Sequence, residues 1–382
     1  MSKWEMVRLG DVATYVNGFA FKPADWSNKG IPIIRIQNLT GTSDVVNYYD
    51  KKYSTKYEIN NGDVLISWSA SLGVYEWKKG KALLNQHIFK VVFDKLVLDK
   101  RFFVFVIAEK LREMSSLVHG STMKHITKKY FDRIEIQLPP LESQKKIATA
   151  LDSANALIEK RKEQIEKLDL LIKSQFIEMF GDPVTNPKGW EIKSIQDCCI
   201  RIFGGGTPSK QNLEYFTGDI PWVSPKDMKT LYIIDSIDHI TKEAVEKSTT
   251  NLIPQKSVLM VIRSGILKKY LPVAINNVII TINQDMKAFT PNKNTKPEFL
   301  LYCFKAIERD VLSRVRSVTA DNIEFSDFKR REIISPPLIV QNQFAEFVEK
   351  VEAQKTLLQK SLADMEQNYQ SLLQKCFKGE IF

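Results

Sequence analysis

The chain of 382 residues carries the same series of segments twice, in the same order. The partners, first half then second, are Trp4–Asp11 with Trp190–Asp197, Gly30–Pro32 with Asp219–Pro221, Leu84–Gln86 with Ile282–Gln284, and Leu138–Leu141 with Ser335–Leu338. A repeat of this length predicts a duplicated domain, because solenoid repeats are only about 20–50 residues long. Two similar halves favour a pseudo-two-fold molecule, which suits a target that also has two similar halves.

Composition narrows the class of partner. The chain has 55 Lys and Arg against 45 Asp and Glu, a net charge of +10, which favours nucleic acid, a membrane surface or an acidic protein. The start of the chain lacks the apolar core of a signal peptide, and no apolar run is long enough to span a bilayer. The 4 cysteines form no CxxC motif. We therefore expect a cytoplasmic protein without a membrane partner, a metal or a cofactor.

Each half mixes short β-rich runs with turns, and two prolines close it. Strands are predicted at Ile31–Ile36, Gly62–Ser67, Phe89–Phe93, Asp132–Leu138, Ile220–Val223, Val258–Ile262 and Val278–Ile282. Helical character is predicted for Arg101–Met114 and for its counterpart, Glu298–Val311. Proline cannot extend a sheet, so Pro139–Pro140 and Pro336–Pro337 are expected to end the two domains.

Two long helices are predicted after these prolines, because apolar residues there follow a 4-3 spacing. The first seam consists of Ile147, Leu151, Ala154, Ile158, Ile165, Leu168, Ile172 and Met179, and the second of Phe344, Val348, Val351, Leu358, Leu362, Met365, Tyr369, Leu372 and Cys376. The helices are expected to run from Pro140 to about Phe176 and from Pro337 to about Phe377, the second being longer by about one turn. A stop signal follows the first at Gly181–Pro183.

The simplest partner for each seam is the other seam. The prediction is an α+β fold with two similar β-rich domains and two long helices paired as an antiparallel coiled coil. The expected domains are residues 1–139, a spacer at 140–182, residues 183–336, and a second spacer at 337–382. A basic residue interrupts each seam, Arg161 in the first and Lys355 in the second. Such a charge can set register, but we expect both side chains to reach solvent.

No catalytic motif is complete. The run Phe203–Thr207 lacks the Lys-Ser/Thr ending of a phosphate-binding loop, so a tight turn is the better interpretation. Asp182 with Glu191 and Lys193 imitates a nuclease spacing, but the first half keeps only the glutamate. The four histidines are scattered, with no metal-binding or Ser-His-Asp pattern around them. We expect a protein that is not an enzyme.

The motifs that remain resemble those of one family. Gly204–Lys210, followed by Tyr215–Asp227, resembles the opening of a target recognition domain in the DNA-specificity (S) subunits of type I restriction–modification systems. Gly120–Ile126 is similar to the family's Gly-Ser/Thr-rich turn, and Leu138–Ile147 is similar to the start of its central helical region. The tail Phe377–Phe382 resembles the family's C-terminal end. The resemblance covers essentially the whole chain. The two halves differ at two turns, because the first half lacks the Gly-Gly-Thr-Pro turn and the second half lacks the Gly-Ser-Thr turn.

The resemblance implies a function and partners. Each β-rich domain would read one half of a split target on double-stranded DNA. The helical pair would set the separation of the half-sites and dock two methyltransferase (modification) subunits, and restriction (motor-nuclease) subunits would join the complex. The chain itself would make and break no bonds. Two alternatives remain open, namely a helical scaffold without DNA specificity and, more weakly, an RNA-binding module, although the aromatic residues show no RNA-recognition pattern.

Base reading requires polar or basic side chains on exposed loops. The candidates in the first half are Arg35, Gln37, Asn38, Ser67, Asn85, Gln86, Ser121 and Lys124, and those in the second are Lys210, Trp222, Lys226, Arg263, Ser264, Asn283 and Gln284. The amide pair recurs at matching places in both halves. It is interpreted either as a base reader or as a structural turn clamp, because asparagine also stabilises turns.

Overall fold

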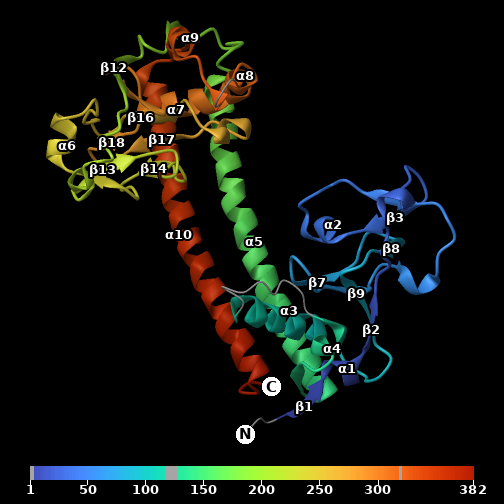
Figure 1. The fold of residues 1–382 in the computed structure, drawn as a ribbon. Helices are drawn as coiled ribbons and strands as arrows, with labels where there is room; N and C mark the ends of the chain where they lie inside the picture. Colours follow the sequence, from blue (N-terminus) through green and yellow to red (C-terminus); the bar gives the residue numbers. More distant parts are fainter. Residues whose placement is uncertain (1–3, 118–126, 318–320) are drawn as a thin grey trace. The chain divides into compact units, whose positions relative to one another are not determined.

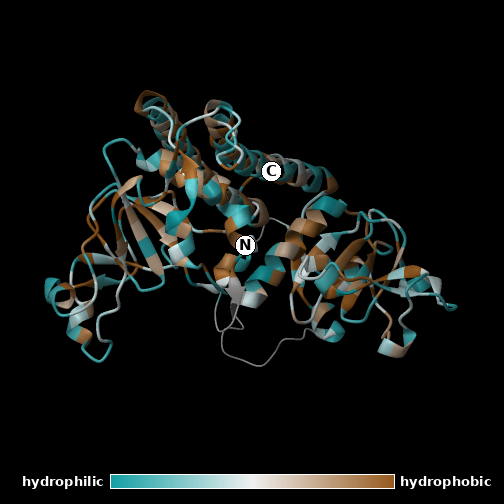
Figure 2. Ribbon diagram, turned by 90° about the horizontal axis from the view of Figure 1, so that it is seen from above, coloured by the Kyte–Doolittle hydropathy of each residue, from teal (hydrophilic) through white to brown (hydrophobic). Residues whose placement is uncertain are grey.

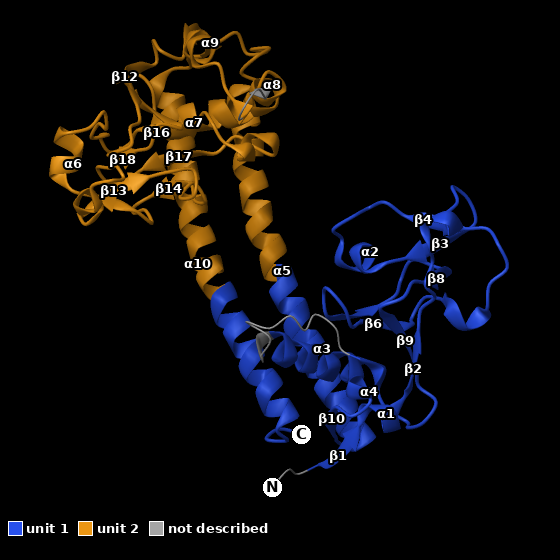
Figure 3. Ribbon diagram, in the orientation of Figure 1, with its two compact units in different colours: residues 1–160, 362–382 blue, residues 161–361 orange. Residues whose placement is uncertain are grey.

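The structure is a computed structural model that describes residues 4–117, 127–317 and 321–382. It divides into two compact units, shown in Figure 3. Unit 1 comprises residues 1–160 and 362–382, and unit 2 comprises residues 161–361. Each unit contains one β-rich domain and part of each long helix (Figure 1). The sequence predicts a different division, in which the two helical spacers are separate from the β-rich domains. That division stays a prediction.

Unit 1 contains two four-stranded sheets and a two-stranded ribbon. The first sheet, in the order β2-β9-β6-β7, consists of Thr14–Asn17, Ile88–Val92, Val64–Ser67 and Gly73–Glu76. The second, in the order β4-β3-β8-β5, consists of Asn47–Tyr49, Ile31–Ile34, Ala82–Leu84 and Glu58–Ile59. The ribbon pairs β1 (Glu5–Arg8) with β10 (Glu135–Leu138). The short helices are α1 (Leu9–Val12), α2 (Ile36–Thr40), α3 (Lys100–Leu117) and α4 (Lys128–Phe131).

Unit 2 repeats this plan. Its five-stranded sheet, in the order β12-β19-β16-β17-β14, consists of Cys199–Gly204, Met286–Pro291, Val258–Val261, Val273–Asn276 and Tyr232–Ile233. The sheet β15-β13-β18 consists of His239–Ile240, Ile220–Val223 and Thr281–Ile282. Ribbons pair β11 (Ile192–Ser194) with β22 (Glu332–Ile334) and β20 (Arg316–Ser317) with β21 (Asp321–Asn322). The short helices are α6 (Lys242–Glu246), α7 (Pro297–Ala306), α8 (Glu308–Ser313) and α9 (Phe325–Arg330). The corresponding strand orders confirm the duplication.

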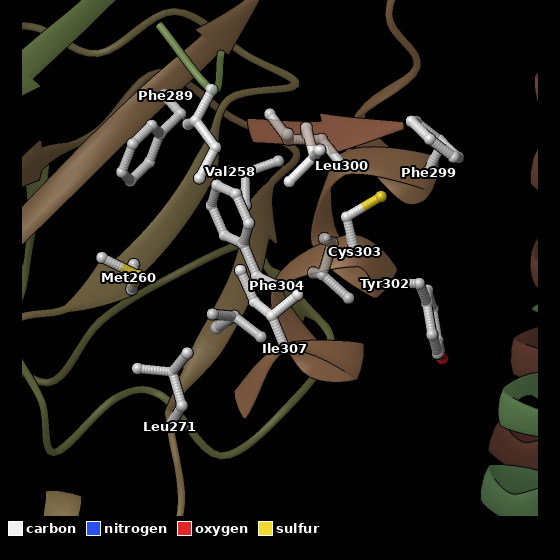
Figure 4. Close-up of a cluster of buried hydrophobic side chains, with 14 of the residues drawn as sticks. Val258, Met260, Leu271, Phe289, Phe299, Leu300, Tyr302, Cys303, Phe304 and Ile307 are labelled. Atoms are coloured by element: carbon white, nitrogen blue, oxygen red, sulfur yellow. The ribbon is translucent and has the colours of Figure 1, made fainter. Parts of the chain in front are cut away.

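The core of unit 2 forms where α7 lies between a sheet and the long helices (Figure 4). On the sheet side, the ring of Phe304 lies 5.0 Å from that of Phe289 in an edge-to-face arrangement. On the helix side, Tyr302 packs against Phe344 at 5.3 Å. Burying such rings contributes on the order of 1.5–3 kcal/mol each through removal of apolar surface from water, so α7 joins the sheet firmly to both long helices.

The long helices α5 (Leu141–Phe180) and α10 (Leu338–Phe377) each contain 40 residues. Within unit 2, Asp169 pairs with Lys355 while Phe176, further along α5, packs on Phe344, which comes earlier in α10. The helices are therefore antiparallel, as predicted. Along both helices hydrophobic and hydrophilic bands alternate (Figure 2). The seam residues Ile147, Leu151, Ile158, Ile172, Val348 and Val351 are buried, and Ile165, Leu168, Leu358, Leu362, Met365 and Leu372 are partly buried.

The expectation that Lys355 reaches solvent is wrong. Its side chain is only 18% exposed, and Nζ lies 2.5 Å from Oδ1 of Asp169 on the other helix. Nζ is also 3.7 Å from Oε1 of Glu352. Burial raises the pKa of Glu352, and Lys355 opposes that shift. A cation inside an apolar seam is tolerated because carboxylates from both helices neutralise it.

Three predicted elements also need correction. Helix α5 continues to Phe180, whose buried ring packs on Phe344, so the helices are equal in length and the second is not longer. Residues 278–280 lie outside β18, because the amide of Asn276 donates to the carbonyl of Val278 and holds a turn there. The predicted helix at Glu298–Val311 is broken at Ile307 into α7 and α8.

A buried glutamine joins each long helix to its domain. In unit 1, Gln144 is 2% exposed, accepts from the backbone N–H of Asp99 and donates to the carbonyl of Pro139. In unit 2, Gln341 is 1% exposed, accepts from the N–H of Lys296 and donates to the carbonyl of Pro336. Each side-chain amide therefore satisfies backbone groups that lie away from water, which fixes the start of the helix on the domain.

Replacing Gln341 by leucine is expected to destabilise unit 2 by about 2–3 kcal/mol, because buried backbone groups lose their hydrogen-bond partners. Thermal denaturation would measure the loss. Gln343→Leu is the matched control, since Gln343 is exposed on the same turn of α10, and its effect should stay within about 0.5 kcal/mol. Equal effects of the two substitutions would show that the buried contact does not stabilise the helix start.

Candidate nucleic-acid interface

Two parallel strands of unit 1 end at the same edge of a sheet. Strand β3 pairs in parallel with β8, with Ile34 opposite Leu84. Arg35 and its neighbours follow β3, while Asn85 follows β8 and donates its backbone N–H to the carbonyl of Ile34 at 3.1 Å. Polar residues from two distant segments are thus brought to one edge. Carboxyl ends of parallel strands are common positions for ligand-binding loops.

Unit 2 builds the same edge from the corresponding strands. Strand β13 pairs in parallel with β18, with Val223 opposite Ile282. Asn283 donates its N–H to the carbonyl of Val223 at 3.0 Å, as Asn85 does in unit 1. The turn after β18 also lies beside Arg263, whose N–H donates to the carbonyl of Asp285. The candidates at this edge therefore come from three separate segments of the chain.

A glycine permits the close approach of a third segment in each unit. A Cβ on Gly18 would stand 2.0 Å from the carbonyl oxygen of Asn85, and a Cβ on Gly205 would stand 1.7 Å from that of Asn283. Hydrogen bonds hold both segments, from the N–H of Phe19 to Leu84 and from that of Gly206 to Ile282. The recurring amide segment is therefore, in both units, the backbone support of the edge.

Several candidates use their side chains to hold this structure. Asn283 is 7% exposed, and its Oδ1 accepts from the N–H of Asp285 at 3.2 Å. Asn38 donates to the carbonyl of Val45 at 2.9 Å, and its Oδ1 accepts from the N–H of Arg35. The side chains of Ser67, Trp222 and Ser264 bond to the backbone of Ser71, Gly206 and Ile266 respectively. Ser67 is 0% exposed and Trp222 is 7% exposed, so both side chains are buried within unit 1 and unit 2 respectively. The side chain of Asn283 bonds within its own turn, and a role in base contact stays a prediction.

The remaining candidates present polar groups at the surface. Arg263, Lys226, Lys210 and Gln284 are exposed in unit 2, and Arg35, Gln37 and Gln86 are partly exposed in unit 1. Asn85 is also partly exposed, but its Oδ1 is buried. The guanidinium of Arg35 lies 5.2 Å from the ring centre of Trp26. Lys226 forms a long ion pair of 3.9 Å with Asp238. Ser121 and Lys124 lie outside the described residues.

Thr207 belongs to the edge but was not a candidate from the sequence. Its hydroxyl donates to Oε1 of Gln284, and Nε2 of the same amide lies 3.4 Å from Oδ2 of Asp285. Thr207 thus fixes the orientation of an exposed amide. The sequence signal for this residue was its position directly after three glycines. The contact itself joins residues 77 apart, so it leaves no local pattern in the sequence.

Within residues 4–117, 127–317 and 321–382, no group of three or more His, Cys, Asp or Glu side chains is arranged to hold a metal ion. Over the same residues, every helix is too short or too polar to cross a membrane. The edges described above present backbone, amide, hydroxyl and cationic groups, and the unit 2 edge also holds the carboxylate of Asp285. Such groups bind nucleic acid through hydrogen bonds and charge.

Gly205→Ala is expected to destabilise unit 2 by about 3 kcal/mol, because the new methyl group meets a backbone carbonyl that cannot move without breaking the turn. Gly18→Ala should act in the same way on unit 1. Gly265→Ala is the control, since a Cβ there meets nothing within 4 Å. Thermal denaturation would compare the three variants, and a Gly205→Ala protein as stable as the control would contradict the close approach.

Comparison with known proteins identifies the class. The model of the type I restriction modification DNA specificity domain matches residues 1–167 and again residues 187–367. The chain therefore belongs to the type I restriction–modification DNA specificity family, as the sequence motifs predicted.

Individual relatives are similar in sequence. The chain is 22% identical to the EcoBI specificity subunit of Escherichia coli, over 99% of this chain and 86% of the relative. It is 25% identical to the MjaIX specificity subunit of Methanocaldococcus jannaschii, over 84% and 78%. A shorter match to the EcoR124I/EcoR124II specificity subunit of E. coli reaches 40% but spans 39% of this chain and 37% of the relative.

Solved structures share the fold. A chain from a type I restriction–modification complex matches with a TM-score of 0.63 at 17% identity, covering 99% of this chain and 98% of its own length. The S subunit from M. genitalium matches with a TM-score of 0.55 at 15% identity, covering 98% and 96%. Both likenesses support the α+β fold with two similar β-rich domains and paired long helices.

Proposed function

We propose that this chain is the non-catalytic subunit that selects the DNA sequence for a type I restriction–modification complex in the cytoplasm. Each β-rich domain reads one half of a bipartite target on double-stranded DNA. The observation that carries this proposal is that both units build the same strand-end edge but place different side chains on it. Arg35 and Gln37 follow β3 in unit 1, whereas Lys226 follows β13 in unit 2. Different side chains on equivalent supports are what reading two different half-sites requires.

The long helices supply the second part of the proposal. They set the gap between the half-sites and dock two methyltransferase subunits, which restriction subunits then join. Exposed apolar residues support docking, namely Leu157, Leu170 and Ile177 on α5 and Leu357 on α10. A protein partner that covered these side chains would remove their apolar surface from water.

A titration tests the proposal. The chain is first assembled with its methyltransferase, and the complex is then titrated with duplexes that contain randomised sites. We expect selection of one family of duplexes with two conserved blocks and an unselected gap. A scaffold without DNA specificity would select no sequence, and an RNA-binding module would prefer single-stranded RNA. Either result would contradict the proposal.

Arg263→Ala is expected to weaken binding to the selected duplex by about 1–3 kcal/mol if its guanidinium contacts a guanine edge. The side chain is exposed at the unit 2 edge and makes no ion pair with any residue that the structure describes. Binding to a duplex of scrambled sequence is the control. Equal losses on both duplexes would assign Arg263 to a phosphate, and no loss on either would remove it from the interface.

A further inference from the structure

One position in the duplicated sheets carries very different side chains in the two units. Strands β9 and β19 follow the recurring amide turn, and each lies between two strands of its sheet. Phe89 of β9 lies opposite Asn17 of β2, and Lys287 of β19 lies opposite Gly204 of β12. On the other side, each lies opposite the penultimate residue of the neighbouring strand, Phe89 opposite Ile66 of β6 and Lys287 opposite Met260 of β16. Phe89 and Lys287 are thus structurally equivalent.

In unit 1 this position is closed. Phe89 is buried, and the indole of Trp68 is stacked on it with ring centres 5.5 Å apart. The indole N–H of Trp68 donates to Oδ1 of Asn17 at 3.2 Å. The stacked rings and this hydrogen bond together cover the end of the strand, so the position in unit 1 is part of the core.

In unit 2 the same position holds a half-buried cation. The ammonium of Lys287 lies 4.8 Å from the ring centre of Phe325 and makes no ion pair with any residue in the described ranges. Burial lowers the pKa of Lys287. Gly204 leaves room beside it, because a Cβ there would stand 3.2 Å from Nζ. Partial burial of a charge without a carboxylate destabilises the free protein, and an acceptor supplied by a ligand would offset that cost.

The cation lies at the candidate interface. Lys287 comes two residues after Asp285, whose carbonyl accepts from the N–H of Arg263, and three residues after the exposed amide of Gln284. Phe325, over which the ammonium lies, follows the segment whose Asn322 bridges to Arg263. Lys287 and Phe325 therefore belong to chain segments that pair with Arg263, a candidate for DNA contact.

We propose that Lys287 determines specificity in the half-site read by unit 2, by donating to the O6 or N7 acceptor of a guanine. This inference rests on the proposed function. Unit 2 has a lysine at this position and unit 1 has a buried phenylalanine. Because the phosphate backbone is the same in both half-sites, this difference favours contact with a base rather than with a phosphate. Lysine is a common partner of the guanine major-groove edge.

The test compares Lys287→Met with wild type, each assembled with its methyltransferase, on a cognate duplex, a scrambled duplex and duplexes with single changes in each half-site. We expect cognate binding to fall by about 5- to 100-fold, with little change on scrambled DNA. Discrimination should relax at one position of the unit 2 half-site and remain intact in the other. Gly204→Ala, which crowds the ammonium, should give the same pattern with a smaller loss.

Lys305→Met is the matched control. Lys305 is also half-buried in unit 2, lies 4.9 Å from the ring centre of Tyr302, and has its pKa lowered by burial, but it is on α7 beside the long helices. Its substitution should leave DNA binding unchanged, and neither methionine should lower the melting temperature. A uniform loss on all duplexes for Lys287→Met would make the residue a phosphate contact, and unchanged binding would make it structural; both overturn the proposal. Failure of the wild-type complex to prefer any duplex would instead overturn the proposed function.

Discussion

Exchanging residues 1–139 for the same region of a relative with a different target is expected to change one half-site completely and leave the other unchanged. The reason is that each β-rich domain has its own core, and the contacts that build the edge of unit 1 come from its own strands. The exchanged region ends before Gln144, so the receiving helix keeps the amide that fixes it to the domain. Sequencing of methylated sites in cells that express the hybrid would measure both half-sites.

The reciprocal exchange of residues 183–336 is the matched variant, and it should change only the other half-site. Melting temperatures of both hybrids would show that they fold. A folded and active hybrid in which both half-sites change would contradict the model of two independent readers.

A heptad inserted between Ile158 and Ile165 of α5 is expected to widen the gap between the half-sites while their sequences stay fixed. Seven residues add about 10 Å to a helix and preserve the apolar seam. That length corresponds to about three base pairs at 3.4 Å each. Because only one helix is extended, we expect the gap to grow by less than this amount.

Inserting a second heptad between Leu358 and Met365 of α10 provides the comparison. Both helices are then extended, and the gap should grow by about the full three base pairs. Insertion of seven residues beside Val184, which is exposed in the turn after α5, is the control, and it should leave the gap unchanged. An unchanged gap in a doubly extended protein that still methylates would show that the helices do not measure the DNA.

Much of the fold could be predicted from the sequence because its signals are local and occur twice. The apolar seam residues, such as Ile147 and Val348, repeat with helical spacing, and the Gly181–Pro183 stop signal follows α5 directly. The end of α5 was misplaced because the burial of Phe180 depends on Phe344, which is distant in the sequence. The pair of Asp169 with Lys355 joins residues 186 apart and leaves no local pattern.

The sequence located equivalent segments in the two units, but it did not show the surroundings of their side chains. The recurrence of Asn85 and Asn283 correctly marked equivalent places, and the structure puts both at the ends of parallel strands. The sequence did not show which polar groups the fold itself uses. Trp222 donates to the carbonyl of Gly206, and Asn283 bonds within its own turn. Such contacts depend on side-chain direction, which composition and spacing do not determine.

The most direct measurement is to sequence the methylated bases in the genome of cells that express this chain together with its methyltransferase. Our account predicts one motif, made of two short specific blocks separated by a gap of constant length in which any base is accepted. Methylation without sequence preference, or at a single continuous motif, would contradict the account.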